Sequence, residues 1–243
     1  MGKPRSELRV FLVQIRDLPV VAEQERQCFL RHCHLEPQQL RIQNVADHPE
    51  LCWATVEDAD VLMIGGAGVH SVTVDYPFTE ALTEVVLRWI DDGRPFFGSC
   101  WGHQFLGKIL GGAVITDKER AEVGTFDLEL TPAGKADPLL DGLPEQFAVQ
   151  LGHNDQIEPA PAELVVLAST PSCLCQLVRL ADRPVYGSQF HSEMGEPEMR
   201  QRARLYQDRY LGADEDAYQR FLGRLRPSPQ ADGLLDRFLR LYS

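Results

Sequence analysis

The sequence predicts an α/β fold: a three-layer domain with a mostly parallel central sheet and helices on both faces. Apolar runs of strand length alternate along the chain with segments of helical period, which is the pattern of such folds. The run at residues 61–64 is continuous and rich in branched side chains, as in a buried central strand, and it ends in a glycine-rich turn at 65–68. A strand, a tight turn and a helix follow in residues 94–110.

Local periodicity predicts the individual elements. The segment 22–33 offers an apolar helical face, and the helix at 78–92 is stopped by Gly93. After residue 194 the sequence becomes charged and helical, with Asp214 and Glu215 placed to start a helix. Strands are predicted at residues 10–15, 40–45, 61–64, 94–97, 121–130, 146–151, 165–169, 175–180 and 185–190, and helices at 22–33, 78–92, 103–110 and 234–242.

Length and composition limit the number of domains and the kinds of partner. The 243 residues, 44% of them hydrophobic, are enough for one domain, and we expect a single domain over residues 1–243 with a helical extension at about 195–243. The 24 basic and 36 acidic residues give a formal net charge of -12, which argues against nucleic acid or an anionic membrane as partner. No apolar run reaches the length of a membrane span, so a soluble, cytoplasmic protein is expected.

The cysteines indicate a reducing compartment, because six are too few for a disulfide framework in a chain of this length. Two groupings raise the question of a metal site: His32-Cys33-His34, and Cys173 with Cys175. Neither has the spacing of a common zinc site. Buried or surface thiols are therefore the favoured interpretation, and no metal ligand is predicted.

The motif that carries chemistry is Gly98-Ser99-Cys100-Trp101-Gly102, between a predicted strand and a predicted helix. Small residues beside a nucleophile permit a strained turn that pushes it out of the sheet edge, and a helix N-terminus stabilises a thiolate. The N–H of Trp101 and an N–H of the glycine loop, at Gly66, are then placed to bind an oxyanion. Because glycine-flanked cysteines also occur as inert buried side chains, the motif needs a partner.

His191 and Glu193 supply that partner. The predicted strand 185–190 runs into His191-Ser192-Glu193, and residues two apart at a strand end project to the same side. Glu193 would fix the orientation of His191, and His191 would take the proton of Cys100 and return it to the leaving group. For the pair alone, the alternative is a structural histidine beside an unrelated acid. The presence of Cys100 in a predicted nucleophile elbow favours the catalytic interpretation over this alternative.

These blocks together resemble the class I, triad-type glutamine amidotransferase family, which includes glutaminase domains of GMP synthetase and anthranilate synthase and the related γ-glutamyl peptidases. The resemblance implies a flavodoxin-like fold, a catalytic triad of Cys100, His191 and Glu193, and no metal or organic cofactor. It covers about residues 10 to 194, and the last predicted helix resembles the family's closing helix. The matching blocks are Gly65-Gly66, residues 98–104, residues 190–193 and, more weakly, residues 122–124 and 152–155.

The resemblance also implies a substrate and a reaction. Gly65, Gln104, His153 and Asn154 would hold glutamine or another γ-glutamyl compound by its amino-acid end. The reaction implied is cysteine-dependent hydrolysis of a γ-glutamyl amide through a thioester on the thiol, which releases glutamate and ammonia or an amine. His103 is interpreted as a helix residue without a part in the mechanism.

Departures from the family pattern limit what is implied. Ser192 stands where the family usually has proline, and Ser99 where it usually has a small aliphatic residue, but neither change removes a reacting group. No P-loop or second catalytic domain follows. The chain is expected to be either the glutaminase of a separate synthase subunit or a free-standing γ-glutamyl hydrolase, with a slight preference for the second. The long stretch 195–229 is interpreted as a lid, an oligomer contact or a docking surface.

Two alternatives come from other classes. One is a catalytically silent regulatory or binding subunit that keeps the fold, against which the intact Cys100, His191 and Glu193 count. The other is a hydrolase of the wider elbow-cysteine superfamily, whose histidine lies elsewhere in the chain. The His-x-Glu pair at a strand end argues against this second alternative.

Overall fold

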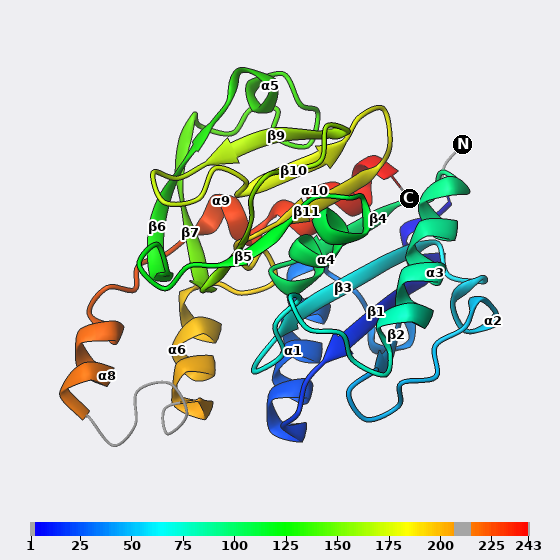
Figure 1. The fold of residues 1–243 in the computed structure, drawn as a ribbon, viewed down its shortest axis with the longest axis horizontal. Helices are drawn as coiled ribbons and strands as arrows, with labels where there is room; N and C mark the ends of the chain where they lie inside the picture. The colour runs from blue at the N-terminus through cyan, green and yellow to red at the C-terminus, as the bar shows by residue number, and fades with distance from the viewer. Residues whose placement is uncertain (1–2, 207–214, 243) are drawn as a thin grey trace.

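The computed structural model describes residues 3–206 and 215–242, and its framework is a nine-stranded sheet in the order β2-β1-β3-β4-β11-β10-β9-β6-β7 (Figure 1). A separate two-stranded sheet pairs β5 with β8. The strands are β1 Val10–Ile15, β2 Leu40–Asn44, β3 Val61–Ala67, β4 Phe96–Ser99, β5 Val114–Thr116, β6 Glu122–Leu130, β7 Gln146–His153, β8 Asp155–Ile157, β9 Leu164–Ser169, β10 Leu177–Leu180 and β11 Val185–Ser188. The α-helices are α1 Pro19–His32, α2 Trp53–Val56, α3 Thr79–Asp91, α4 Trp101–Ile109, α5 Pro132–Lys135, α6 Glu196–Leu205, α8 Glu215–Leu222, α9 Pro229–Asp232 and α10 Leu234–Tyr242, with 3-10 turns at Arg5–Glu7 and Pro37–Gln39.

The parallel strands make one half of the large sheet. β2, β1, β3, β4 and β11 pair in parallel, while β10, β9, β6 and β7 continue the sheet in antiparallel fashion. Parallel neighbours end at the same edge, so the loops that follow β1, β3, β4 and β11 meet there. This edge is where the candidate site lies.

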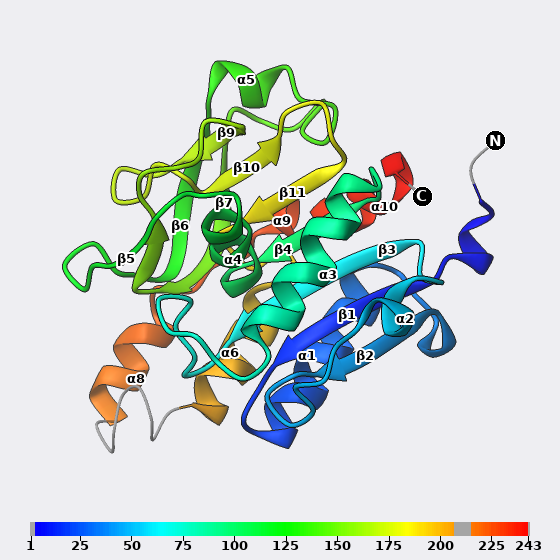
Figure 2. The ribbon, with the colours of Figure 1, turned by 45° about the vertical axis from the view of Figure 1, so that its right-hand side comes forward.

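Alternating side chains divide the core between the two faces of the sheet. In β3, Val61 and Met63 join the apolar cluster that includes α1 and α10, whereas Leu62 and Ile64 join the cluster that includes α3 and α4. Helices therefore cover both faces, with α3 and α4 on the near side in Figure 2. This arrangement confirms the predicted α/β architecture with helices on both faces of the sheet.

Most predicted elements are found within a few residues of their expected bounds. α4 begins at Trp101 rather than at residue 103, and β10 begins at Leu177 rather than at 175. The short elements α2, α5, α9, β5 and β8 were not predicted, because pieces of three or four residues carry no readable period. The expected helix start at Asp214 lies outside the described residues, and α8 is described from Glu215.

The C-terminal helices return to the sheet. α6 packs beside α1, and α8 lies beside β6 (Figure 1). A small apolar cluster joins Cys28 of α1 to Met194, Met199 and Leu225. α10 carries Phe238 into the main core, where its ring lies 5.3 Å from that of Phe97. The charged sequence after residue 194 is thus integrated with the fold.

Replacing Phe238 with alanine tests that integration. The ring is fully buried, so its loss removes apolar contacts and leaves a cavity, and we expect a destabilisation of about 3–5 kcal/mol. Urea unfolding followed by circular dichroism measures the change. Leu241→Ala on the same helix is the control, because Leu241 is 46% exposed and its truncation should change stability by no more than about 0.5 kcal/mol. Equal effects of both substitutions would show that α10 is not part of the cooperative core.

Candidate active site

Cys100 lies at the sharp turn between β4 and α4. Its backbone has φ of 50°, in the left-handed region that non-glycine residues rarely adopt, and its N–H donates to the carbonyl of Ser188 at 2.7 Å. The turn needs glycine on both sides. A Cβ atom on Gly98 would lie 2.5 Å from the backbone of Gly102, and one on Gly102 would lie 2.6 Å from the carbonyl oxygen of Ile64. The predicted elbow is therefore the geometry that the sequence adopts.

His191 and Glu193 are brought to this turn from the end of β11. The Nδ1 of His191 donates to Glu193 Oε1 at 2.6 Å, and both side chains are buried. The second carboxylate oxygen, Oε2, accepts from the hydroxyl of Ser99 at 2.6 Å. Ser99 is thus a site residue that the sequence interpretation passed over as a neutral departure, and its hydroxyl holds the carboxylate that holds the imidazole.

Charge keeps this pair ionised in spite of its burial. Burial alone would lower the pKa of His191, but the Glu193 carboxylate and the Cys100 side chain outweigh it and raise that pKa to about 9. Burial would likewise raise the pKa of Glu193, but His191 and the Ser99 hydroxyl bring it down to about 2. At neutral pH the imidazole therefore carries a proton that it can give to a leaving group.

The predicted turn at 65–68 is wrong in its start, because Gly65 and Gly66 continue β3 to Ala67, and Gly66 lies against His191 and Cys100. A Cβ atom on Gly66 would lie 3.0 Å from His191 Cε1 and 3.6 Å from Cys100 Cβ, so only glycine fits between them. Trp101, the first residue of α4, follows the thiol directly. A Cβ atom on Gly65 would instead meet Glu25 Oε1 at 2.7 Å. The structure thus brings Gly66 and Trp101 to the thiol and places Gly65 against Glu25.

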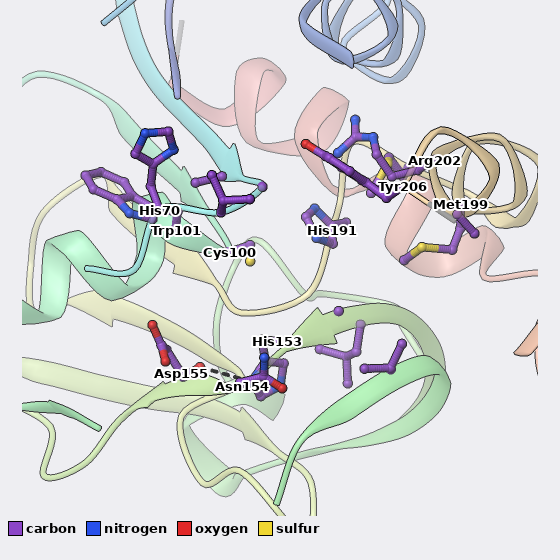
Figure 3. Close-up of a pocket in the computed structure, with 18 of the residues that line it drawn as sticks. His70, Cys100, Trp101, His153, Asn154, Asp155, His191, Met199, Arg202 and Tyr206 are labelled. Carbon is purple, nitrogen blue, oxygen red and sulfur yellow. Dashed lines mark hydrogen bonds between the residues drawn. The ribbon is translucent and has the colours of Figure 1, made fainter. Parts of the chain in front are cut away.

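A cavity of about 720 Å³ opens over Cys100 (Figure 3). Gln104, His153 and Asn154 all line it. Gln104 Nε2 donates to the carbonyl of Asp155 at 2.7 Å. The ring nitrogens of His153 face Glu122 Oε2 at 3.1 Å and the carbonyl of Asp155 at 3.0 Å. His153 is therefore fixed by protein groups, while Asn154 is exposed to the cavity.

Gln189 is a further residue that the sequence interpretation missed. It is fully buried, its Nε2 donates to Cys100 Sγ at 3.8 Å, and its Oε1 accepts from Gln104 Nε2 at 3.1 Å. Gln189 therefore contacts the nucleophile directly and joins it to Gln104. Its position, between the end of β11 and His191, is the only signal that the sequence offers.

The sequence analysis also did not predict a second wall of the cavity, which residues of β1 and α6 form. Arg16, at the end of β1, and Met199, Arg202 and Tyr206, from α6 and the residue after it, line the cavity together with Cys100. The spacing of 199, 202 and 206 puts these three on one helix face, and the end of a parallel strand is where ligands bind. Both signals are present in the sequence.

His103 and the cysteines of the two groupings considered for a metal do not line the cavity. His103 is fully buried, and burial lowers its pKa to about 3, so it is a neutral core histidine in agreement with its interpretation as a helix residue without a part in the mechanism. Cys33, Cys173 and Cys175 are buried free thiols. Over residues 3–206 and 215–242, no group of three or more His, Cys, Asp or Glu side chains could hold a metal ion. No helix of the same residues is long and apolar enough to cross a membrane.

A cysteine at a strand–helix elbow, beside a hydrogen-bonded histidine and glutamate that follow a neighbouring parallel strand, is typical of α/β proteins with a nucleophile elbow. Comparison with known proteins narrows this class. The profile of the family described as glutamine amidotransferase class-I matches residues 29–205. The chain belongs to this family, whose members generally hydrolyse glutamine, and the resemblance drawn from the motifs is confirmed.

Proteins of similar sequence have names that are consistent with this family. The chain is 36% identical over 108 residues to the GMP synthase of Neisseria meningitidis serogroup B, covering 43% of this chain and 20% of that protein. It is 31% identical over 100 residues to a glutamine-hydrolysing GMP synthase subunit of Methanopyrus kandleri, covering 41% and 52%. The chain thus matches about half or less of the length of these relatives.

Solved structures show the same fold over nearly the whole chain. A glutamine amidotransferase from Thermotoga maritima superposes with a TM-score of 0.74 at 20% identity, covering 96% of this chain and 98% of that one. A glutamine amido transferase from Methylobacillus flagellatus gives a TM-score of 0.73 at 19% identity, covering 97% and 95%. The match confirms the predicted fold class.

The coupling between His191 and Glu193 can be measured by NMR. In the wild type we expect the His191 ring to titrate with a pKa of about 9. In Glu193→Gln the carboxylate is lost while burial remains, so the pKa of His191 should fall by more than about one unit. Glu163→Gln, at an exposed position outside the site, is the control and should leave the titration unchanged. A His191 pKa that is the same in Glu193→Gln and in the wild type would contradict the described pairing.

Proposed function

We propose that this chain is a free-standing hydrolase of γ-glutamyl amides, with Cys100 as nucleophile. The observation that carries the proposal is the placement of the Cys100 thiol on the floor of the cavity, beside a His191 ring that Glu193 holds by Nδ1. Hydrogen bonding through Nδ1 leaves Nε2 of the ring for proton transfer. Family membership supports a γ-carboxamide as the group attacked.

The reaction needs two steps. The thiolate of Cys100 attacks the γ-carbonyl carbon, and the resulting oxyanion accepts hydrogen bonds from the N–H groups of Gly66 and Trp101. The C–N bond then breaks, the protonated His191 gives its proton to the departing amine, and a γ-glutamyl thioester remains. Neutral His191 next takes a proton from the water that attacks the thioester, and the C–S bond breaks to free glutamate and restore the Cys100 thiolate beside protonated His191.

The amino-acid end of the substrate needs polar groups of its own in the cavity. We propose that Gln104, His153 and Asn154 position its α-amino and α-carboxylate groups, since all three line the cavity, where Figure 3 shows His153 and Asn154 across from Cys100 and His191. Gly65 has no side chain, and a Cβ atom on it would meet Glu25. It therefore contributes to the proposed substrate site only through its backbone.

The size of the cavity favours a substrate larger than glutamine. Its volume of about 720 Å³ lies within the range of about 300–1,000 Å³ that is typical of sites for drug-sized ligands, which leaves room for a group attached to the γ-amide nitrogen. The second candidate is a glutaminase subunit that passes ammonia to a separate synthase subunit. It is favoured by the similarity to proteins that are named as single subunits of glutamine-hydrolysing GMP synthases.

Release of glutamate and amine from glutamine and a panel of γ-glutamyl amides, by the full chain alone, tests the proposal. Cys100→Ala should lower kcat/KM by at least about 10⁴-fold, because the residual catalysis of such sites comes from binding and the oxyanion hole alone. Cys52→Ser is the matched control, because Cys52 is an exposed thiol, and it should retain full activity.

Each outcome of this assay decides between the candidates. Turnover of γ-glutamyl conjugates with glutamine a poor substrate supports the free-standing hydrolase. Turnover of glutamine that is feeble until a synthase is added supports the glutaminase subunit instead. Cys100-independent turnover, or no turnover of any γ-glutamyl compound, would overturn the proposal.

A further inference from the structure

A second buried pair of a glutamate and a histidine lies in the antiparallel half of the sheet. Glu122 begins β6 and His153 ends β7, and the two residues lie directly opposite each other across this strand pair. They are 1% and 6% exposed, and Nε2 of His153 lies 3.1 Å from Oε2 of Glu122. His153 lines the cavity over Cys100, whereas neither step of the proposed reaction uses Glu122.

Stability alone does not account for this pair. Burial of ionisable side chains is costly, and well-packed apolar residues in place of such a pair often leave stability unchanged or raise it. A third buried polar side chain is committed to the same carboxylate, because Nε2 of Gln176 donates to Oε2 of Glu122 at 2.5 Å. The Gln176 side chain is fixed in turn by the hydroxyl of Thr170 at 3.2 Å. The carboxylate is therefore held in one place, against His153.

Both ring nitrogens of His153 are used by the protein. Nδ1 lies 3.0 Å from the carbonyl oxygen of Asp155, which can only accept, so Nδ1 carries a hydrogen and donates it. Nε2 faces Glu122. Since neither nitrogen is left for a substrate, His153 acts through the backbone that its ring holds.

The carbonyl of Asp155 connects this ring to the helix that begins after the nucleophile. The same oxygen accepts a hydrogen bond from Nε2 of Gln104 at 2.7 Å, and that nitrogen also donates to Oε1 of Gln189 at 3.1 Å. Both hydrogens of the Gln104 amide nitrogen are thus used. The orientation of the amide is fixed, and its oxygen is the atom that can accept a hydrogen bond from a substrate ammonium group.

Asn154 depends on the same contacts. It is exposed and lies between His153 and Asp155, and Figure 3 shows the three side chains together along one side of the cavity. The carboxylate of Asp155 accepts from the hydroxyls of Ser71, at 2.5 Å, and Thr116, at 2.6 Å. The backbone is therefore tied down on both sides of Asn154, by the Asp155 side chain after it and by the His153 ring before it.

We propose that Glu122 is a positioning residue for recognition of the glutamyl group. Its carboxylate orients the His153 ring, and the ring holds the backbone segment that places Asn154 and the Gln104 amide. This role rests on the proposed γ-glutamyl hydrolase activity and adds a residue to its substrate site. The amino-acid end of the substrate is unchanged in the transition state, so contacts to it contribute equally to both states. Glu122 should therefore affect KM rather than kcat.

Steady-state kinetics on the γ-glutamyl amide that the full chain hydrolyses best test this role. Glu122→Met removes the carboxylate and keeps the length of the side chain. We expect it to raise KM by at least about 10-fold, the lower limit for a hydrogen bond to a charged group, and to change kcat by less than about 3-fold. Glu122→Gln keeps an amide oxygen that can accept from His153, and it should raise KM by less. Glu129→Met is the control, because Glu129 lies on the same strand and is exposed, and it should keep the wild-type KM.

Alkylation of Cys100 separates a positioning role from general damage to the fold. Iodoacetamide has no amino-acid end, whereas a chloromethyl ketone analogue of glutamine has one. Glu122→Met should slow labelling of Cys100 by a subsaturating concentration of the analogue by at least about 10-fold, and should leave labelling by iodoacetamide within about 3-fold of the wild-type rate. Mass spectrometry of the peptide that contains Cys100 measures both rates.

Three results would overturn the role of Glu122 and leave the γ-glutamyl hydrolase standing: an unchanged KM in Glu122→Met, a fall in kcat at unchanged KM, or equal slowing of both alkylating reagents. Should Glu122→Met fail to fold, Glu122→Gln decides in its place, and a wild-type KM in that variant would overturn the role. Failure of the wild-type chain to hydrolyse any γ-glutamyl compound would overturn the proposed function, and the role of Glu122 with it.

Discussion

The Glu193 carboxylate is the group on which the rest of the site depends. It is fully buried, and a buried carboxylate is stable only when its oxygens are hydrogen-bonded and its charge is paired. Ser99, the last residue of β4, binds one oxygen, and His191, which follows β11, binds the other. The pairing therefore joins the ends of two neighbouring parallel strands and orients the imidazole toward Cys100. Cys100, Gly66 and the cavity all lie next to the imidazole that this pairing orients.

Much of this arrangement could be predicted from the sequence because the signals are local. The glycines around Cys100 report a turn that no larger residue fits, and the two-residue separation of His191 and Glu193 reports one side of a strand end. Ser99 could not be interpreted in the same way. Its contact with Glu193 follows from the pairing of β4 with β11, in which Ser99 lies opposite Ser188, and that register joins positions far apart in the chain.

The wall of the cavity formed by Arg16, Met199, Arg202 and Tyr206 was missed for a related physical reason. Arg202 reaches the cavity because α6 packs against α1, where Gln24 Nε2 donates to the carbonyl of Glu198 at 2.9 Å. Helical period predicts that Met199 and Arg202 share a face, but it does not say what that face contacts. The stretch 195–229, interpreted as a lid, an oligomer contact or a docking surface, supplies one wall of the cavity in its described part.

Covalent trapping of the reaction tests the central claim most directly. The full chain would be mixed with a γ-glutamyl amide, quenched in acid within the first turnover, and analysed by intact mass spectrometry with peptide mapping. The account predicts a mass increase of one γ-glutamyl group, located on the peptide that contains Cys100 and absent from Cys100→Ala. A γ-glutamyl group on another residue, or turnover that continues in Cys100→Ala, would contradict it.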